Sequence, residues 1–314
     1  MVHTRVFIGG FTYELGEDEH HIDDLPELNG KPEQLLMLKD AGFEYFRISN
    51  LSVLELAGKA IEKFFAKTSI PPAEIDAVVF ATSSMGISNH LSHYFLCNFL
   101  LQHKLENAYP LISSLSFCGN FLPALEKGYN YIQTGQFKNV LVVVSDIIPV
   151  KSSRLAPPDV ALGSDGAACC LLSVNNFSNF EISSINQAVN VRSGLMDPDK
   201  DFARYVKAVG DGIKKVTSRS LATKENARVS VTKIFTNNYS INVCKSYLRL
   251  IRIPEDKIDL VNIGRFGHAG AADICINISD YLASVKTTDK EAFLLLSSGP
   301  FMWGSALIQE LGSN

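Results

Sequence analysis

The chain lacks any run of about 18 apolar residues, and its start, MVHTRVFIGG, lacks a basic segment followed by a long apolar one. Both absences argue against export and against membrane spanning, so we expect a soluble, cytoplasmic protein. Clusters of Lys and Arg are missing too, because 29 basic and 33 acidic residues are scattered and give a formal net charge of −4. Without a basic patch, neither nucleic acid nor an acidic membrane is an expected partner.

Paired cysteines are also missing. The six cysteines form no C-x-x-C pair, which fits reduced thiols in a cytoplasm better than a disulfide framework and argues against a structural zinc site. The segment 14–26, rich in Asp, Glu and His, is expected to be a solvated loop. We expect no metal site from its His20, His21 and Asp23, because no further residues of that type accompany them.

The features that are present indicate a large α/β fold. A length of 314 residues and a hydrophobic fraction of 46% allow an extensive core. Apolar, β-branched runs alternate with stretches that carry apolar residues at helical spacing, which is typical of α/β proteins. Strands are expected at 77–81, 140–144, 258–263 and 293–296, and helices at 52–65 and 122–132, the latter ending before Gly135.

Two segments repeat one pattern. IEKFFAKTSIPPAEIDAVVF (61–80) and CKSYLRLIRIPEDKIDLVNI (244–263) share a helix, an Ile-Pro break, an acidic spacer, Ile-Asp and a strand. Such a repeat predicts a duplicated α/β unit, with halves at 1–174 and 175–314. The charged stretch 192–228 shows no strand character and is expected to be a surface insertion.

One cysteine lies between an apolar run and a helical pattern, in SLSFCGNFLPAL. A thiol is a good nucleophile only as thiolate, which the N–H groups at a helix start stabilise. Gly119 permits close backbone approach, and Pro123 is tolerated only in the first helical turn, so the helix should begin near 119–122. Cys118 is therefore either a nucleophile at a helix start or a small buried residue.

A cysteine nucleophile needs a base or a cationic partner. Of the seven histidines, only His268 directly follows a strand-like run, in GRFGHAGAA. If the two halves are duplicates, equivalent strand ends meet near a common axis. Cys118 and His268 could then converge although they lie 150 positions apart in the sequence.

With these residues in place, the chain resembles the thiolase-fold condensing enzymes of the β-ketoacyl-acyl carrier protein (ACP) synthase III type. The resemblance implies a five-layered α-β-α-β-α fold built from two duplicated halves, a homodimer, and an acyl-Cys118 intermediate formed from acyl-CoA or acyl-ACP, with no tightly bound cofactor. It further implies an acyl-thioester transferase of fatty-acid-like, polyketide or other specialised biosynthesis. The matching blocks are SFCGNF (116–121) for the nucleophile elbow, GSDGAA (163–168) for G-D-G-A-G, RFGHAGAA (265–272) for x-x-G-N-T-S-A-A, and FMWGSAL (301–307) for F-x-W-G-S-A-L.

The chain departs from the family pattern at its two other catalytic positions. In the family a His and an Asn stabilise the enolate that forms when a malonyl thioester loses carbon dioxide. Here Asn237, or Asn238 if the alignment shifts by one residue, replaces the histidine, and His268 replaces the asparagine. An amide and an imidazole can exchange corners and still offer one base and one donor, so we expect Cys118 as nucleophile, His268 as base or oxyanion donor and Asn237 as oxyanion donor. The alternative is a catalytically impaired subunit that pairs with an active paralogue.

The remaining expectations concern the oxyanion turn and the substrate entrance. Ser298 and Gly299 match the family's oxyanion turn, but Pro300 has no N–H to donate, and losing one such donor costs about 100- to 1,000-fold in rate. Other donors must compensate, or the chemistry is less demanding than carbon–carbon bond formation. Arg204 and Lys207 could offer a basic face to the acidic helix of a carrier protein, or simply be a solvated charged surface.

Overall fold

The computed structural model describes residues 4–84, 93–156, 160–197, 200–222, 230–285 and 291–311. Strands from both parts of the chain form one continuous sheet. Those that precede residue 174 are β1 (Phe7–Leu15), β4 (Ala77–Ala81), β5 (Tyr109–Ser113), β6 (Asn139–Asp146) and β9 (Gly166–Ser173). Those that follow it are β10 (Phe180–Val189), β11 (Lys233–Thr236), β12 (Ala292–Ser298) and β13 (Met302–Glu310). Their order is β11-β12-β13-β10-β1-β9-β6-β4-β5.

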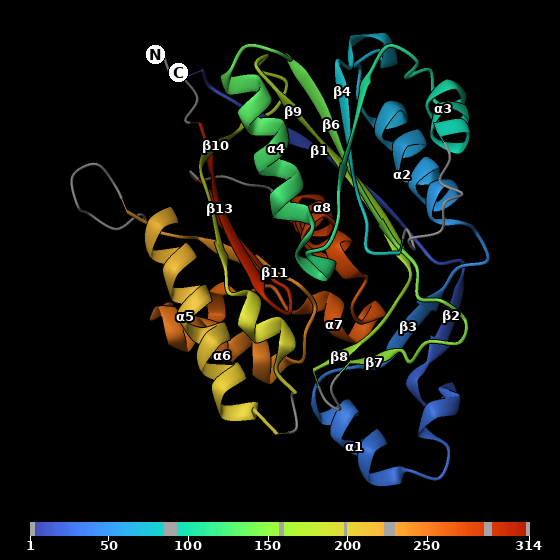
Figure 1. Cartoon of the computed structure of the whole chain (residues 1–314), viewed down its shortest axis with the longest axis vertical. Coiled ribbons are helices and arrows are strands. Elements are labelled where there is room, and N and C mark those ends of the chain that lie inside the picture. Colours follow the sequence, from blue (N-terminus) through green and yellow to red (C-terminus); the bar gives the residue numbers. More distant parts are fainter. Residues whose placement is uncertain are drawn as a thin grey trace.

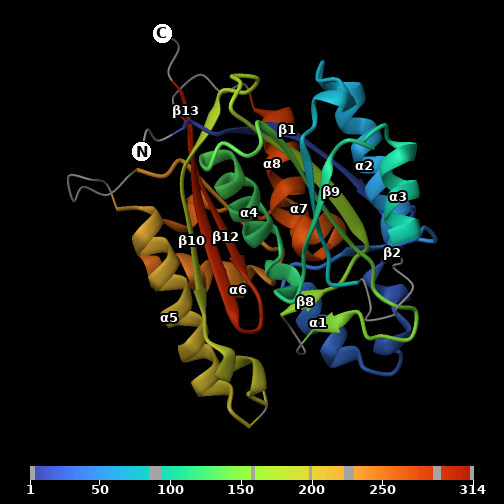
Figure 2. The ribbon, with the colours of Figure 1, turned by 45° about the horizontal axis from the view of Figure 1, so that its top comes forward.

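The sheet consists of two halves that meet at one register pair, Phe7 of β1 with Glu181 of β10. Helices α4 (Phe121–Gln133) and α8 (Asp273–Ser284) lie between the halves, and each packs against strands of both (Figures 1 and 2). Helices α2 (Val53–Lys67) and α3 (His93–Gln102) cover the outer side of the first half, while α5 (Phe202–Ser220) and α6 (Ile241–Ile251) cover the second. The five-layered α-β-α-β-α architecture is thus confirmed, whereas the domain boundary at 174/175 stays a prediction.

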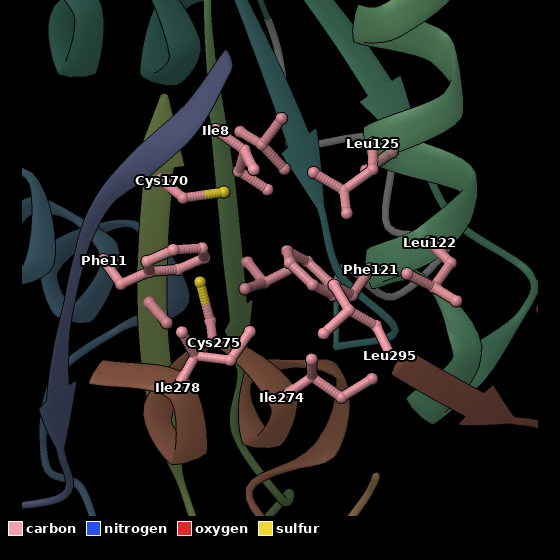
Figure 3. Close-up of a cluster of buried hydrophobic side chains, with 14 of the residues drawn as sticks. Ile8, Phe11, Phe121, Leu122, Leu125, Cys170, Ile274, Cys275, Ile278 and Leu295 are labelled. Carbon is pink, nitrogen blue, oxygen red and sulfur yellow. The ribbon is translucent and has the colours of Figure 1, made fainter. Parts of the chain in front are cut away.

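The central layer contains the main core. Ile8 and Phe11 of β1 point towards the central helices, where they pack in one cluster with Leu125 of α4 and Ile278 of α8. All four side chains are at most 2% exposed (Figure 3). The strands β4 and β6 are buried along their whole length, as their uniform apolar runs predicted. At its start, α2 has a reciprocal capping box between Ser52 and Glu55, which fixes the helix where the sequence pattern placed it.

The predicted strand at 258–263 is wrong. Ile258 makes a single bridge to Ile234, and the chain then enters helix α7 (Val261–Phe266). Ile263 and Phe266 are buried at helical spacing, while Val261 is 74% exposed, a pattern that a strand buried on both faces does not allow. The repeat therefore holds for the helix and the Pro-led 3-10 turn, η3 (Pro72–Glu74) and η6 (Glu255–Lys257), but the first copy continues as a strand and the second as a helix.

The expected solvated loop at 14–26 and the expected surface insertion at 192–228 both contain regular elements. In 14–26, strand β1 continues to Leu15, and β2 (Asp18–His21) pairs with β3 (Tyr45–Ile48), since a two-stranded edge tolerates charged side chains on its solvent face. The expected surface insertion contains the 19-residue helix α5, which buries Ala208, Ile213 and Val216 against the sheet. Charged residues outnumber the apolar residues that this helix buries, so its apolar side was not recognised in the sequence. Of the expected insertion, residues 223–228 lie outside the described ranges.

The cysteines are present as free thiols. All six cysteines are free, and four of them are buried. None of the helices in the described ranges is long and apolar enough to cross a membrane. Within the same ranges, no three His, Cys, Asp or Glu side chains are arranged to hold a metal ion. The cytoplasmic location stays a prediction.

Two glycines in α5 provide a matched test of how this helix packs. A Cβ at Gly212 would lie 2.2 Å from a ring carbon of Trp303, which is 2% exposed, whereas a Cβ at Gly210 would meet Leu250 at an ordinary 3.6 Å. We expect Gly212→Ala to lower the free energy of unfolding by about 1–3 kcal/mol through overpacking. Gly210→Ala should raise it by about 0.5–1 kcal/mol, because alanine is the better helix former. Urea unfolding of both variants measures the difference, and equal effects would contradict this packing.

Candidate active site

Cys118 lies at the start of the central helix. It is the middle residue of a 3-10 turn, η4 (Phe117–Gly119), and α4 begins at Phe121 with Pro123 in its first turn, as the sequence predicted. Phe117 has φ +51°, in the left-handed region that bulky residues avoid, and such strain is typical of functional sites. Buried Asn120 holds the loop, since its side-chain oxygen accepts the Ser116 N–H at 3.0 Å. The thiol is therefore presented on a strained, braced turn.

The turn between β12 and β13 packs directly on this loop. A Cβ at Gly299 would lie 2.5 Å from the Ser116 carbonyl oxygen, so only glycine allows the approach. The contact places Ser298 beside the nucleophile, where its carbonyl oxygen is 3.3 Å from Cys118 Sγ. Ser116 Oγ also lies 3.0 Å from Met302 Sδ, so the structure brings together the SFCGNF and FMWGSAL blocks that the resemblance identified.

His268 lies in the RFGHAGAA block, and its backbone is bonded to the segment that contains the GSDGAA block. Its N–H donates to Leu162 O and its carbonyl accepts the Ser164 N–H, both at 2.8 Å. Its ring Nδ1 is 2.5 Å from Oδ2 of Asp273, which is fully buried. Asp273 also accepts the backbone N–H groups of Ala269 and Asn238, both at 2.7 Å. The carboxylate therefore fixes the orientation of the imidazole.

The charge of His268 follows from these neighbours. Burial alone would lower the pKa of the imidazole, but the charge and the hydrogen bond of Asp273 outweigh it, and a hydrogen bond to Cys118 adds to them, which raises the pKa to about 10. At neutral pH the ring is therefore an imidazolium that bridges Asp273 and Cys118. A cation at this place stabilises negative charge on the sulfur.

Asn237 lies beside the thiol but has a different orientation from the one we expected. Its Nδ2 donates to the carbonyls of Cys118 (2.9 Å) and Gly270 (3.2 Å), and its Oδ1 accepts the Ser298 N–H (3.1 Å). Both amide hydrogens are thus engaged with backbone. These contacts support a positioning role, in which Asn237 ties three segments together, rather than the expected role as oxyanion donor.

The backbone N–H groups of the expected oxyanion turn also donate to protein acceptors. The Ser298 N–H is taken by Asn237, and the Gly299 N–H donates to Met302 O at 2.8 Å, which closes the hairpin. Pro300 has no N–H. The Cys118 N–H, in contrast, has no acceptor among the described residues. It is the backbone donor nearest the sulfur that stays available.

Sequence reasoning missed two residues of the site. Tyr239 OH is 2.9 Å from Cys118 Sγ and 2.5 Å from Ser298 O, and its ring lies 5.1 Å from that of His268. Burial and the nearby Cys118 raise the pKa of this phenol well above its ordinary value, so it stays protonated. The other is Asp273, whose only sequence signal was a single acidic residue in the apolar run GHAGAADICINI.

Arg204 and Lys207 lie on the exposed face of α5. They form ion pairs with Asp201 (2.9 Å) and Asp211 (2.6 Å), and their side chains are 74% and 76% exposed. Between them in sequence, burial raises the pKa of Tyr205, and the Cys118 sulfur adds to the rise. The two cations do not touch the catalytic groups, and their role towards a carrier protein stays a prediction.

Comparisons with known proteins found similar chains and similar structures. No family model matches the chain. It is 23% identical to β-ketoacyl-ACP synthase III of Staphylococcus haemolyticus, over 83% of this chain and 84% of the relative. The structure of 3-oxoacyl-ACP synthase III from Aquifex aeolicus superposes with a TM-score of 0.80 at 20% identity, over 97% and 99% of the two chains. The priming β-ketosynthase of the R1128 polyketide pathway gives 0.78 at 16% identity, over 98% of each chain.

The chain is therefore a thiolase-fold protein, similar over nearly its whole length to condensing enzymes. Among proteins of that fold, it is similar to those named β-ketoacyl-ACP synthase III. The four blocks that carried the resemblance in the sequence contribute the Cys118 loop, its supporting turn, and the segments that hold His268.

A single hydroxyl provides a test of the environment of the sulfur. Tyr239→Phe removes the O–H next to Sγ and leaves the ring. A hydrogen bond to a charged group is worth about 1.5–3 kcal/mol, so alkylation of Cys118 by iodoacetamide at pH 7 should slow by about 10- to 100-fold. Tyr131→Phe, on α4 but away from the thiol, is the control and should leave the rate unchanged. An unchanged rate in Tyr239→Phe would show that the phenol does not support the thiolate.

Proposed function

We propose that the protein is an acyl-thioester transferase of the synthase III type that carries its acyl group on Cys118. One observation supports this most strongly: the thiol, at the start of a central helix, faces an imidazolium whose other nitrogen is bonded to a buried carboxylate. This is the arrangement of an activated cysteine nucleophile. The names of the relatives support an acyl carrier protein as the source of the acyl group, and the resemblance in the sequence adds acyl-CoA.

The first half-reaction uses the proton that His268 already carries. The Cys118 thiolate attacks the thioester carbonyl, and the Cys118 N–H, which has no acceptor among the described residues, is free to donate to the developing oxyanion. The carbon–sulfur bond to the substrate's thiol breaks, and His268 gives its proton to the departing thiolate. The products are acyl-Cys118, neutral His268 and free CoA or ACP thiol.

Release of free thiol tests this proposal. Rapid mixing of the protein with a panel of acyl-CoA thioesters of increasing chain length should give a burst of CoA close to one equivalent per chain with at least one of them. Acyl-ACP is tried in parallel, because the basic face of α5 suggests a carrier-protein partner. No burst with any thioester would contradict the proposal.

A second candidate function is that of a non-catalytic subunit paired with an active paralogue. The observation that favours it is that Asn237, Ser298 and Gly299 have their donors engaged with protein groups. This function predicts no thiol release by the protein alone and a stable complex on co-expression with an active synthase. The burst experiment therefore separates the two candidates.

The proposal includes association into a homodimer through the edge of the sheet. Strand β5 ends the sheet, and its Tyr109 and Ile112 are 54% and 49% exposed. An edge strand with exposed apolar side chains is a template for pairing with a second chain. Light scattering of the purified protein should give the mass of two chains, and the mass of one chain would contradict a homodimer.

A further inference from the structure

The donors around the sulfur indicate which second substrate the site suits. Decarboxylative condensation passes through an enolate, whose oxygen needs at least two donors already aimed at it. Asn237, the expected amide donor, has both hydrogens on the carbonyls of Cys118 and Gly270. Turning this amide towards a substrate would break both bonds and also release the Ser298 N–H from its Oδ1. Tyr239, the hydroxyl next to the sulfur, has a single hydrogen, which lies between Cys118 Sγ (2.9 Å) and Ser298 O (2.5 Å). Among the described residues, the site therefore has no second side-chain donor that is free to bind an enolate oxygen.

The imidazole of His268 is held in an orientation that suits it to accept a proton from a second substrate. Asp273 is fully buried and accepts three hydrogen bonds, one of them from the Nδ1 side of His268, so the ring is held with its other nitrogen towards Cys118. Nucleophile, imidazole and carboxylate in this order form a relay that takes a proton from an attacking O–H or N–H group. Tyr239 packs against the imidazole ring and limits its rotation.

From this arrangement we infer that acyl-Cys118 is discharged onto a proton-bearing nucleophile, the hydroxyl or amine group of a second small molecule, rather than onto the carbanion of a malonyl thioester. The inference rests on the proposed function, because it needs the acyl-enzyme. The site therefore makes an ester or an amide, and no carbon dioxide is released.

The step balances without any further reactant. The acceptor oxygen or nitrogen attacks the thioester carbonyl while its proton passes to Nε2 of His268, which is neutral after the first half-reaction. The Cys118 N–H is placed to donate to the tetrahedral oxyanion. The bond from carbon to Sγ then breaks, the ester or amide leaves, and the protonated His268 again lies beside the Cys118 sulfur. Acylation removes the contribution of the Cys118 charge to the raised pKa of His268, so the imidazole gives up its proton more readily in the acyl-enzyme.

The experiment separates formation of the acyl-enzyme from its discharge. The protein is first acylated with the best thioester of the burst assay, and excess thioester is removed. The acyl-enzyme is then mixed with ethanolamine, with hydroxylamine, with carboxyl-labelled malonyl-CoA or with buffer, and its decay is followed by intact mass. If no acyl-enzyme forms at all, the proposed function fails and the discharge step is not reached.

The inference predicts that ethanolamine or hydroxylamine speeds the decay at least tenfold over buffer and that malonyl-CoA releases no label. The acceleration over buffer should be lost in Asp273→Asn, which distinguishes enzymatic discharge from direct attack by the nucleophile in solution. His268→Gln replaces Asp273→Asn if that variant does not fold. Label released from malonyl-CoA, decay in buffer as fast as with either nucleophile, or equal acceleration in the variants would each overturn it.

Discussion

Replacing Cys118 by alanine is expected to abolish the burst of free thiol and to lower acyl transfer by about 10,000-fold or more. The reason is chemical, because the side chain that forms the covalent bond is gone, while the loop that carries it is held by Ser116, Asn120 and Gly299 and should keep its fold. Stopped-flow detection of free CoA with a thiol reagent measures the effect.

The matched control is Cys97→Ser, which removes the exposed thiol of α3. It should acylate at the wild-type rate. Circular dichroism and urea unfolding of Cys118→Ala should match the wild type, so that lost activity cannot be ascribed to lost structure. A burst that persists in Cys118→Ala would place the acyl group elsewhere and refute the role of this cysteine.

Replacing Asp273 by asparagine is expected to lower acyl transfer by about 10,000-fold, the size of effect seen when a triad carboxylate becomes an amide. Asparagine keeps the shape of the side chain but removes the charge that holds His268 protonated. Its amide can also present an NH₂ group, instead of an oxygen, to Nδ1 of His268. The exposed carboxylate of Asp256 provides the control, since Asp256→Asn removes one charge far from the thiol. Equal rates in the two variants would contradict a role for Asp273 in positioning His268.

The pH profile separates a positioning role from a merely structural one. The folded pKa of His268, about 10, lies above its ordinary value of about 6.5. The favourable interaction with Asp273 is therefore complete below about pH 6.5 and is lost as the pH rises through about 10, together with the proton that the leaving thiolate needs. Without the Asp273 charge, burial lowers the pKa of His268, so the alkaline limb of acylation should move to lower pH in Asp273→Asn. An unmoved limb would contradict this assignment.

Much of the fold could be predicted from the sequence, because its main signals are local. The strands at 77–81 and 140–144 are buried on both faces and therefore read as continuous apolar runs. The prediction of a strand at 258–263 was wrong because it relied on the same signal. A short apolar run does not distinguish a strand from a buried helix. Helix α5 was missed because many charges on its solvent face outnumber a narrow apolar stripe that only the sheet reveals.

The residues of the site could be predicted only where the backbone conformation requires particular neighbours in the sequence. Cys118 is marked by the glycine and proline that follow it, and His268 by the small residues around it. Asn237 was expected at the site, but the orientation of its amide depends on carbonyls far away in the sequence, at Cys118 and Gly270. Tyr239 likewise depends on folding, because nothing in TNNYS indicates which of these side chains faces the sulfur.

The most direct test of the account is the site of acylation in the wild-type protein. After incubation with acyl-CoA or acyl-ACP, intact-mass analysis and peptide mapping locate the added group. The account predicts one acyl group per chain, on the peptide that contains Cys118, with its loss when hydroxylamine is added. No added mass, or an acyl group on any other residue, would contradict it.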